Sequence, residues 1–184
     1  MLSLKWKDTK ISGKLNKAGL AEDHKYRDRE GLINFQQSII DRYLSDYKDC
    51  DPIKVLDVST GAGVFVELMN DLGHAAKGTE KPGTPYQVFL KSQKTDVIYH
   101  DSSEVPFPFK KGEFDLVTCI SSFNFYPEDF YKKILKELFR ISKKTVFLLL
   151  TKSESFDKNK ELFDAPVDGW TLSVQGPYYR WDKV

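Results

Sequence analysis

Short apolar runs alternate with amphipathic segments between Lys54 and Leu150, and this alternation limits the folds that the chain can adopt. The first run, KVLDV (54–58), is apolar almost without interruption, which is typical of a strand covered on both faces. The segments between the runs carry apolar residues at three- and four-residue intervals, as amphipathic helices do. The pattern predicts an α/β fold in which a doubly wound, mostly parallel sheet has helices on both faces.

Glycine and proline mark several element ends. Gly73 closes one predicted helix, and Pro85 and Pro127 stand in the first turns of two others. The predicted helices cover 29–48, 63–73, 84–92 and 127–142, and the predicted strands cover 54–58, 75–80, 96–100, 114–120 and 145–150.

The two ends of the chain differ from its centre. The tail GWTLSVQGPYYRWDKV (169–184) has two extended runs broken at Gly176-Pro177, which predicts a C-terminal antiparallel hairpin on the sheet. Residues 1–28 are polar and lack periodicity, which predicts an N-terminal arm. We expect this arm to cover the active site, with a solvated charged arm as the alternative. We expect residues 29–184 to form one domain.

Composition excludes several classes of protein. The 28 basic and 27 acidic residues leave a net charge of +1, so no overall field attracts nucleic acid or an anionic membrane. The longest apolar run, TVFLLLT (145–151), is too short to span a bilayer. Cys119 lies in an apolar run and should be buried, whereas Cys50 lies in a loop. Neither cysteine has a metal-ligand spacing, and we expect a cytoplasmic protein without a metal.

The loop DVSTGAGV (57–64) follows the first strand. Gly61 and Gly63 remove side chains where the chain turns into a helix, so that backbone N–H groups can approach a ligand. An ordinary tight turn is the alternative explanation. Glu80 ends the second strand, where a carboxylate can accept hydrogen bonds from both hydroxyls of a ribose.

The third strand ends at His100 and is followed at once by Asp101-Ser102. We expect His100 to pack within the strand, with contact to the ligand as the alternative. Asp101 can accept a hydrogen bond from the exocyclic amine of adenine, and the backbone of Ser102 can contact the ring, although Asp-Ser-Ser also suits a turn. Matches at three successive strand ends predict a nucleoside ligand. The other histidine near a strand, His74, is expected to be exposed in a turn.

Residues Lys54 to Thr151 resemble the class I S-adenosylmethionine-dependent methyltransferases, in particular small-molecule enzymes of the type 11 kind. The resemblance rests on VLDVSTGAG (55–63), GTE (78–80) and HDSSEVPFPFKKGEFDLVTCISS (100–122). It implies a Rossmann-like sheet and S-adenosylmethionine as the cofactor. The positions that it assigns are Asp57, Gly61 and Gly63 around the methionine end, Glu80 at the ribose, Asp101 and Ser102 at the adenine, and Ser121 and Ser122 near the methionine.

One position departs from the family pattern. Ser59 stands where the first glycine of the loop is usual, and we expect its Cβ to narrow the cofactor pocket or shift the loop. This departure keeps a second hypothesis open, a catalytically weak or inactive cofactor-binding module or partner subunit. A third is an NAD-dependent oxidoreductase, which the sequence disfavours because Val66 replaces the third glycine of its fingerprint.

The sequence constrains the methyl acceptor less. After the fourth strand it reads SSFNFYP (121–127), without the Asn/Asp-Pro-Pro-aromatic tetrad of nucleobase amino-methyltransferases, so a nucleic-acid acceptor is not expected. A small-molecule or glycan-like acceptor methylated on O or N is expected instead, in an open site that a homodimer partner can complete. Candidate catalytic residues are His24, Tyr26, Asn124 and Tyr126, and Arg27 is a candidate for binding the methionine carboxylate.

Overall fold

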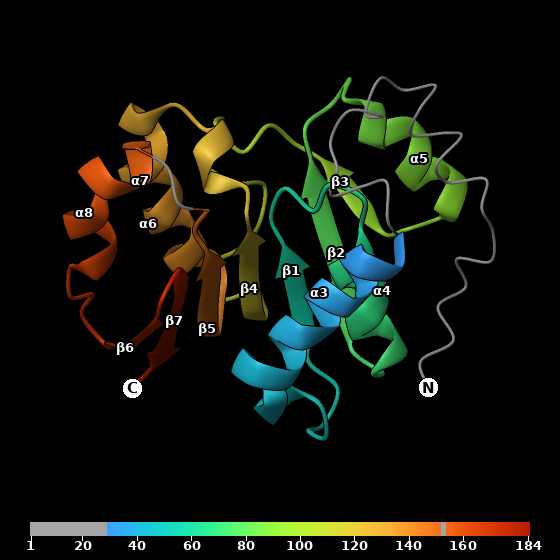
Figure 1. Ribbon diagram of the computed structural model, residues 1–184, viewed down its shortest axis with the longest axis horizontal. Helices are drawn as coiled ribbons and strands as arrows, with labels where there is room; N and C mark the ends of the chain where they lie inside the picture. Colours follow the sequence, from blue (N-terminus) through green and yellow to red (C-terminus); the bar gives the residue numbers. More distant parts are fainter. Residues whose placement is uncertain (1–28, 152–153) are drawn as a thin grey trace.

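A computed structural model of the protein describes residues 29–151 and 154–184 (Figure 1). Its centre is a seven-stranded sheet in the order β3-β2-β1-β4-β5-β7-β6. The strands are β1 (Lys54–Asp57), β2 (Ala75–Glu80), β3 (Val97–Tyr99), β4 (Phe114–Ile120), β5 (Ser142–Leu149), β6 (Trp170–Gln175) and β7 (Tyr178–Lys183). The first five are mutually parallel, as predicted.

Helices cover both faces of the sheet. The α-helices are α3 (Arg29–Tyr43), α4 (Val64–Asp71), α5 (Pro85–Gln93), α6 (Tyr131–Ile141), α7 (Glu154–Lys158) and α8 (Lys160–Asp164), and the 3-10 helices are η1 (Ser45–Tyr47), η2 (Phe123–Phe125) and η3 (Glu128–Phe130). Figure 1 shows α6, α7 and α8 grouped beside one half of the sheet and α4 and α5 beside the other.

Successive strand residues point to opposite faces, and each face has its own core. Val55 of β1 joins the apolar cluster that contains Ile39 of α3 and Phe65 of α4. Its neighbour Leu56 joins the cluster that contains Ile134 of α6. The burial of both faces of β1 explains why its sequence is apolar almost without interruption. The prediction of a doubly wound, two-sided sheet is confirmed.

The direction of winding reverses between β1 and β4. From β1 the chain runs outward through β2 to β3, then crosses back to β4 and continues to β5, and β1 pairs in parallel with both β2 and β4. A ligand crevice is expected beyond the carboxyl ends of strands at such a reversal. The loops after β1, β2, β3 and β4 therefore meet at the expected binding edge.

The C-terminal hairpin also forms as predicted. Strands β6 and β7 pair antiparallel, and β7 lies between β6 and β5, to which it is antiparallel as well. Tyr179 and Trp181 on one face of β7 are buried in the core beside α6 and α8. Arg180, between them in sequence, faces the opposite side, where α3 ends.

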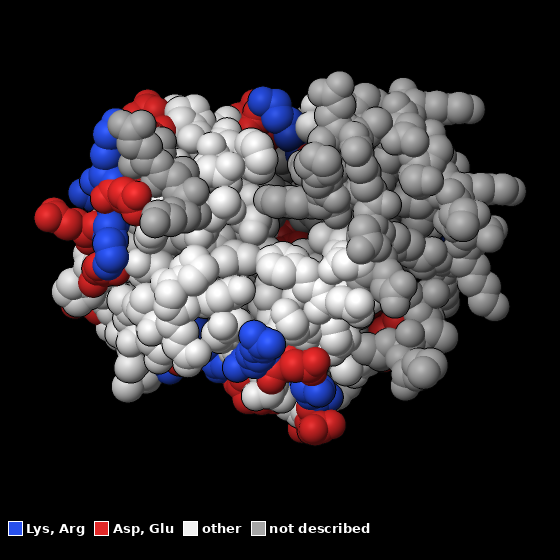
Figure 2. All heavy atoms as spheres, viewed as in Figure 1, with Lys and Arg blue, Asp and Glu red and all other residues white. Residues whose placement is uncertain are grey.

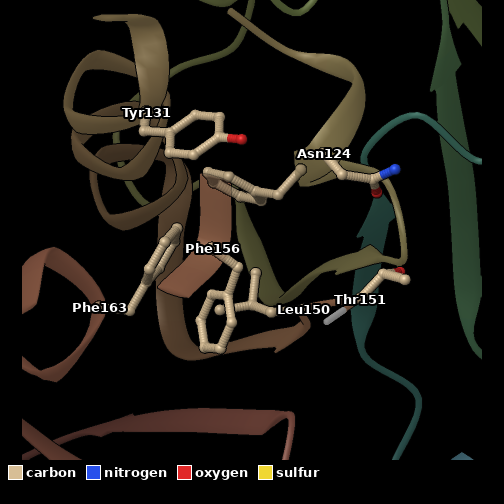
Figure 3. Close-up of a pocket in the computed structure, with 7 residues that line it drawn as sticks. Asn124, Tyr131, Leu150, Thr151, Phe156 and Phe163 are labelled. Carbon is tan, nitrogen blue, oxygen red and sulfur yellow. The ribbon is translucent and has the colours of Figure 1, made fainter. Parts of the chain in front are cut away.

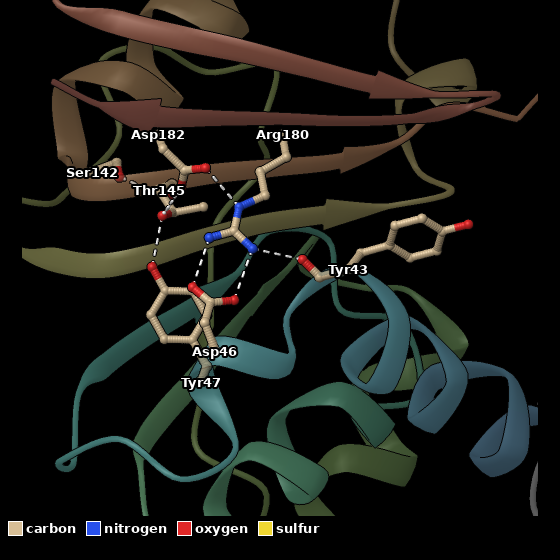
Figure 4. A network of polar contacts seen from close by, with 7 residues as sticks. All are labelled: Tyr43, Asp46, Tyr47, Ser142, Thr145, Arg180 and Asp182. Atoms are coloured by element: carbon tan, nitrogen blue, oxygen red, sulfur yellow. Dashed lines mark hydrogen bonds and ion pairs between the residues drawn. The ribbon is translucent and has the colours of Figure 1, made fainter.

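Arg180 ties the last strand to the first helix through the polar network in Figure 4. Its guanidinium donates two hydrogen bonds to the Asp46 carboxylate, at 2.8 and 2.7 Å, and one to the carbonyl of Tyr43 at 2.7 Å. Its Nε donates to Asp182 at 2.8 Å, and Asp182 also accepts from Thr145 of β5 at 2.6 Å. The network fixes the end of α3 against the sheet.

Element ends and one side chain differ from the predictions. The first predicted helix stops at Tyr43 and continues as η1, and α6 begins at Tyr131, after η3. The expectation that His74 is exposed is wrong, because the residue is only 6% exposed. Its ring lies below η1, where Nε2 is 2.6 Å from the carbonyl of Tyr47 and Nδ1 accepts from the Ile53 amide.

Cys119 is buried, as predicted, and Cys50 lies exposed in the loop between η1 and β1, where a loop was predicted. No helix in ranges 29–151 and 154–184 is both long and apolar enough to cross a membrane.

Candidate active site

A cavity of about 820 Å³ lies at the carboxyl edge of the parallel strands. This volume falls in the range of about 300–1,000 Å³ that is usual for small-molecule and cofactor sites. Residues of α3, of the loops after β1, β2, β3 and β4, and of η2 line it. The cavity is therefore where the topology predicts a ligand site.

The glycine loop after β1 forms one side of this cavity. Gly61, with φ of 57°, lines the cavity, and its N–H donates to a Glu80 carboxylate oxygen at 3.0 Å. Gly63, with φ of 74°, precedes α4 and is not among the lining residues. A Cβ at Gly63 would come within 2.8 Å of the Leu90 side chain on α5 and would sit on a backbone with positive φ, so close packing and backbone conformation both favour glycine here.

Glu80 lies at the end of β2, as the sequence predicts, and lines the cavity. It is 6% exposed, and its carboxylate accepts one hydrogen bond from Gly61 and one from the Thr84 hydroxyl at 3.1 Å. Burial raises the pKa of this carboxyl, against the effect of those hydrogen bonds. A carboxylate has about four acceptor positions, so Glu80 can accept further hydrogen bonds from a ligand.

Asp57, at the end of β1, lies behind the loop and does not line the cavity. It is 3% exposed and accepts a hydrogen bond from the Thr118 hydroxyl at 2.7 Å. Burial, together with the nearby Glu80 carboxylate, raises the pKa of Asp57 to about 6, despite the hydrogen bond from Thr118. Asp57 therefore acts as a buried support of the glycine loop after β1.

Asp101 and Ser102 both line the cavity after β3. Partial burial opposes ionisation of Asp101, but hydrogen bonds from Lys81 and Ser103 outweigh it and lower the pKa of the carboxyl to about 2. The Lys81 ammonium lies 2.8 Å away, and the Ser103 N–H and hydroxyl donate at 3.0 and 2.8 Å. Asp101 is thus a fixed anion already paired with a cation.

Ser59 adopts a left-handed backbone conformation that favours glycine, with φ of 57°. Its hydroxyl lies 2.6 Å from the Tyr126 hydroxyl and 3.3 Å from that of Ser102, and its carbonyl accepts from Ser122 at 3.1 Å. This hydroxyl cluster, Ser59, Ser102, Ser122 and Tyr126, joins the loops after β1, β3 and β4. The Ser59 side chain is thus bonded to neighbouring loops and belongs to the cavity wall.

The remaining predicted site residues are divided among three places. Tyr126 and Ser121 line the cavity, and Ser121 also has a positive φ of 57°. Asn124 is exposed and borders a separate pocket of about 10 Å³, where its amide points away from the rings of Tyr131, Phe156 and Phe163 (Figure 3). His24, Tyr26 and Arg27 lie outside the described residues.

The cavity walls differ in charge. The charged wall consists of Glu80, Lys81, Thr84, Asp101, Ser102 and Ser103, from the loops after β2 and β3. The apolar walls consist of Leu32, Phe35 and Gln36 from α3 and of Phe125, Tyr126 and Pro127 from η2 and the residues after it. The sequence did not indicate Lys81, Phe35 or Phe125 as site residues. The one available signal was Gln36, a polar residue at an apolar position of the α3 pattern.

Within the described part of the chain, no group of three or more His, Cys, Asp or Glu side chains is arranged to hold a metal ion.

Comparison with known proteins agrees with this geometry. The sequence model of the methyltransferase domain family matches residues 27–178, and the chain belongs to this family. Together with the fold, the match confirms the prediction of a class I S-adenosylmethionine-dependent methyltransferase, and it decides against the oxidoreductase hypothesis. No curated protein sequence matches the chain.

Solved structures share the fold at low sequence identity. The PH0226 protein of Pyrococcus horikoshii is 18% identical with a TM-score of 0.61, over 88% of this chain and 91% of that one. Magnesium protoporphyrin IX methyltransferase of Synechocystis, solved with bound S-adenosylmethionine, is 16% identical with a TM-score of 0.59, over 85% and 81%. A TehB-like S-adenosylmethionine-dependent methyltransferase of Corynebacterium glutamicum is 16% identical with a TM-score of 0.55, over 83% and 95%.

Proposed function

We propose that the protein transfers a methyl group from S-adenosylmethionine to an O or N atom of a small-molecule or glycan-like acceptor. The observation that carries the proposal is the buried Glu80 carboxylate at the end of β2, facing a cavity at the reversal point of the sheet. A carboxylate at this position suits the two vicinal hydroxyls of a ribose.

The other residues around the cavity fit the rest of such a cofactor. Asp101 and Ser102 would hold the adenine, and Gly61, Ser59 and Ser121 would adjoin the methionine end. Asp57 and Gly63 would act indirectly, by supporting and packing the loop. Arg27 stays a predicted contact of the methionine carboxylate.

Methyl transfer requires the protein mainly to align the methyl donor with the acceptor. When bound, S-adenosylmethionine would supply an activated methyl group on a sulfonium, which leaves as a neutral thioether, and Glu80, Asp101 and Ser102 would hold it in the cavity. Holding two reactants at near-attack distance can lower the barrier by about 7–11 kcal/mol. Burial raises the pKa of the Tyr126 phenol well above its usual value, so Tyr126 would orient groups by hydrogen bonding rather than remove a proton as a base.

The surface charge supports a small acceptor. On the described face shown in Figure 2, Lys and Arg side chains are mixed with Asp and Glu near the edges, and the central area is largely uncharged. Nucleic-acid binding normally uses a clustered basic surface. We propose a cytoplasmic enzyme, in which residues 1–28 cover the acceptor and a homodimer partner can complete the site.

The Ser59 departure gives little support to an inactive module. Its backbone keeps the conformation of a glycine, and its hydroxyl is bonded to Tyr126. The serine is therefore accommodated in the loop, and its presence does not imply loss of cofactor binding.

Calorimetric titration with S-adenosylmethionine, S-adenosylhomocysteine and NAD tests the proposal. Saturable binding of the first two and none of NAD is expected. A lysate incubated with enzyme and a deuterated methyl donor should then show a labelled product by mass spectrometry. Binding without any labelled product would favour the module, and no binding would refute the proposal.

A further inference from the structure

Two exposed aromatic side chains from distant parts of the sequence line the same cavity. Phe35 of α3 is 38% exposed, and Phe125 of η2 is 76% exposed. Among the residues whose side chains are described, five large hydrophobic ones are exposed, and Phe35 and Phe125 are the aromatic ones of these. Exposed apolar side chains that gather at one site usually mark a binding surface.

No charged residue belongs to the apolar walls, as far as the described lining residues show. The charged lining residues are Glu80, Lys81 and Asp101, all from the loops after β2 and β3. Lys81 is paired with Asp101, and Glu80 accepts from Gly61 and Thr84. A charged acceptor against α3 and η2 would lose water without gaining a partner, which is unfavourable.

Gln36, which lines the cavity, carries a side-chain acceptor without a partner. Its side-chain Oε1 is buried and has no hydrogen-bond partner. A buried acceptor without a partner destabilises a fold, and a ligand N–H or O–H can satisfy it. The position is on α3, next to Phe35, and Gln36 itself lines the cavity.

We propose that the apolar walls bind an uncharged, largely aromatic methyl acceptor with one N–H or O–H group, and that this group donates to Gln36 Oε1. The inference rests on the proposed function and narrows its acceptor class, because it replaces a glycan-like acceptor by an apolar one. Gln36 would select and orient the acceptor, while Phe35 and Phe125 would cover its rings.

Two matched probes test the hydrogen bond. 1-Naphthol has the required aromatic ring and O–H donor, and 1-methoxynaphthalene has the same ring without the donor. Fluorescence titration of the full chain, with and without saturating S-adenosylhomocysteine, should show tighter binding of 1-naphthol by about three- to tenfold. Methyl glucoside should not compete with either probe.

Substitutions assign the effect to residues. Gln36→Leu should abolish the preference for 1-naphthol over 1-methoxynaphthalene. It should not lower the melting temperature or the affinity for S-adenosylhomocysteine. Phe125→Asp should weaken both probes at least fivefold, whereas Val174→Asp, on an exposed residue of β6 that does not line the cavity, should change neither.

Several results would overturn the inference. They are the absence of saturable naphthol binding, an equal affinity for the two probes, a preference that survives Gln36→Leu, or a fall in cofactor affinity in that variant, which would assign Gln36 to the cofactor. Failure of naphthol with intact S-adenosylhomocysteine binding rejects only this inference. Failure of S-adenosylhomocysteine binding rejects the proposed function.

Discussion

The charged wall and the apolar walls of the cavity differ in how completely their polar groups are already paired. On the charged wall, Glu80 and Asp101 each have protein partners, and Lys81 is held by Asp101. On the apolar walls, two aromatic side chains are exposed and the Gln36 oxygen has no partner. Polar side chains that the protein already holds in place can bind a ligand without reorganising. Exposed apolar side chains and unpaired polar atoms gain contacts only when a ligand binds. This difference supports the proposal that the charged wall holds the cofactor and that the apolar walls hold the acceptor.

The largest effect is expected at Glu80. Glu80→Ala removes the proposed acceptor of two ribose hydroxyls and should weaken S-adenosylmethionine binding by about 3–4 kcal/mol, at least a hundredfold. Calorimetry on the folded variant measures this. Glu161→Ala, which removes an exposed carboxylate from α8, is the matched control and should bind as the wild type does. A loss below threefold in Glu80→Ala would mean that the charged wall does not hold the ribose.

Asp57, beneath the charged wall, should make stability depend on pH. Because burial raises its pKa from 3.8 to about 6, the folded state binds more protons than the unfolded state between these values. The free energy of unfolding should therefore fall as pH rises from about 4 to 7, by up to about 3 kcal/mol. Asp57→Asn should remove this component of the slope.

Urea unfolding of both proteins across this pH range provides the measurement. Asp51→Asn, on an exposed residue, should keep the wild-type slope. An identical slope in wild type and Asp57→Asn would show that Asp57 is already ionised in the folded protein at low pH.

Arg180 tests whether the apolar walls depend on the attachment of α3. Arg180→Ala removes the hydrogen bonds to Asp46, Asp182 and the Tyr43 carbonyl and should lower the free energy of unfolding by about 2 kcal/mol, allowing for the partial exposure of both carboxylates. Since α3 carries Phe35 and Gln36, naphthol binding should weaken more than cofactor binding.

Arg180→Lys should recover only part of the loss, because an ammonium cannot make the paired hydrogen bonds of a guanidinium. Lys48→Ala, which breaks an exposed ion pair with Asp41, should leave unfolding unchanged. Equal weakening of cofactor and naphthol binding in Arg180→Ala would remove the distinction between the walls.

The smallest effect concerns the hydroxyl cluster that joins the two kinds of wall. Ser59→Ala and Tyr126→Phe each remove the 2.6 Å hydrogen bond, so a double-mutant cycle on unfolding should show a coupling energy of about 1 kcal/mol. The control cycle pairs Tyr126→Phe with Ser38→Ala, whose hydroxyl bonds to the Phe35 carbonyl, and should be additive. Additivity in the first cycle would show that the Ser59 hydroxyl does not hold Tyr126.

The sequence was informative about the charged wall because order along the chain determines it. In a parallel sheet the residues at the carboxyl ends of the strands lie at the same edge. The position of Glu80 and Asp101 at this edge could therefore be predicted from the strand ends alone. The sheet, its two covered faces and the C-terminal hairpin followed from periodicity in the same way. The particular partners, such as Lys81 for Asp101, depend on loop conformations that no periodicity encodes.

The residues of the apolar walls could hardly be predicted from the sequence. Phe35 and Phe125 resemble ordinary core positions, and only the three-dimensional structure shows that they remain exposed at one cavity. Asn124 and Tyr126 are two residues apart, yet of these two only Tyr126, which follows η2, lines the cavity. His74 was misassigned because its turn packs below η1, a contact between segments that are distant in sequence.

A crystal structure of the protein with S-adenosylhomocysteine and 1-naphthol tests the division of the cavity most directly. Both ribose hydroxyls are expected within hydrogen-bonding distance of the Glu80 carboxylate, and the naphthol ring is expected between α3 and η2 with its O–H donating to Gln36. A nucleoside lying against Phe35 and Phe125, with Glu80 contacting no ligand atom, would contradict this division.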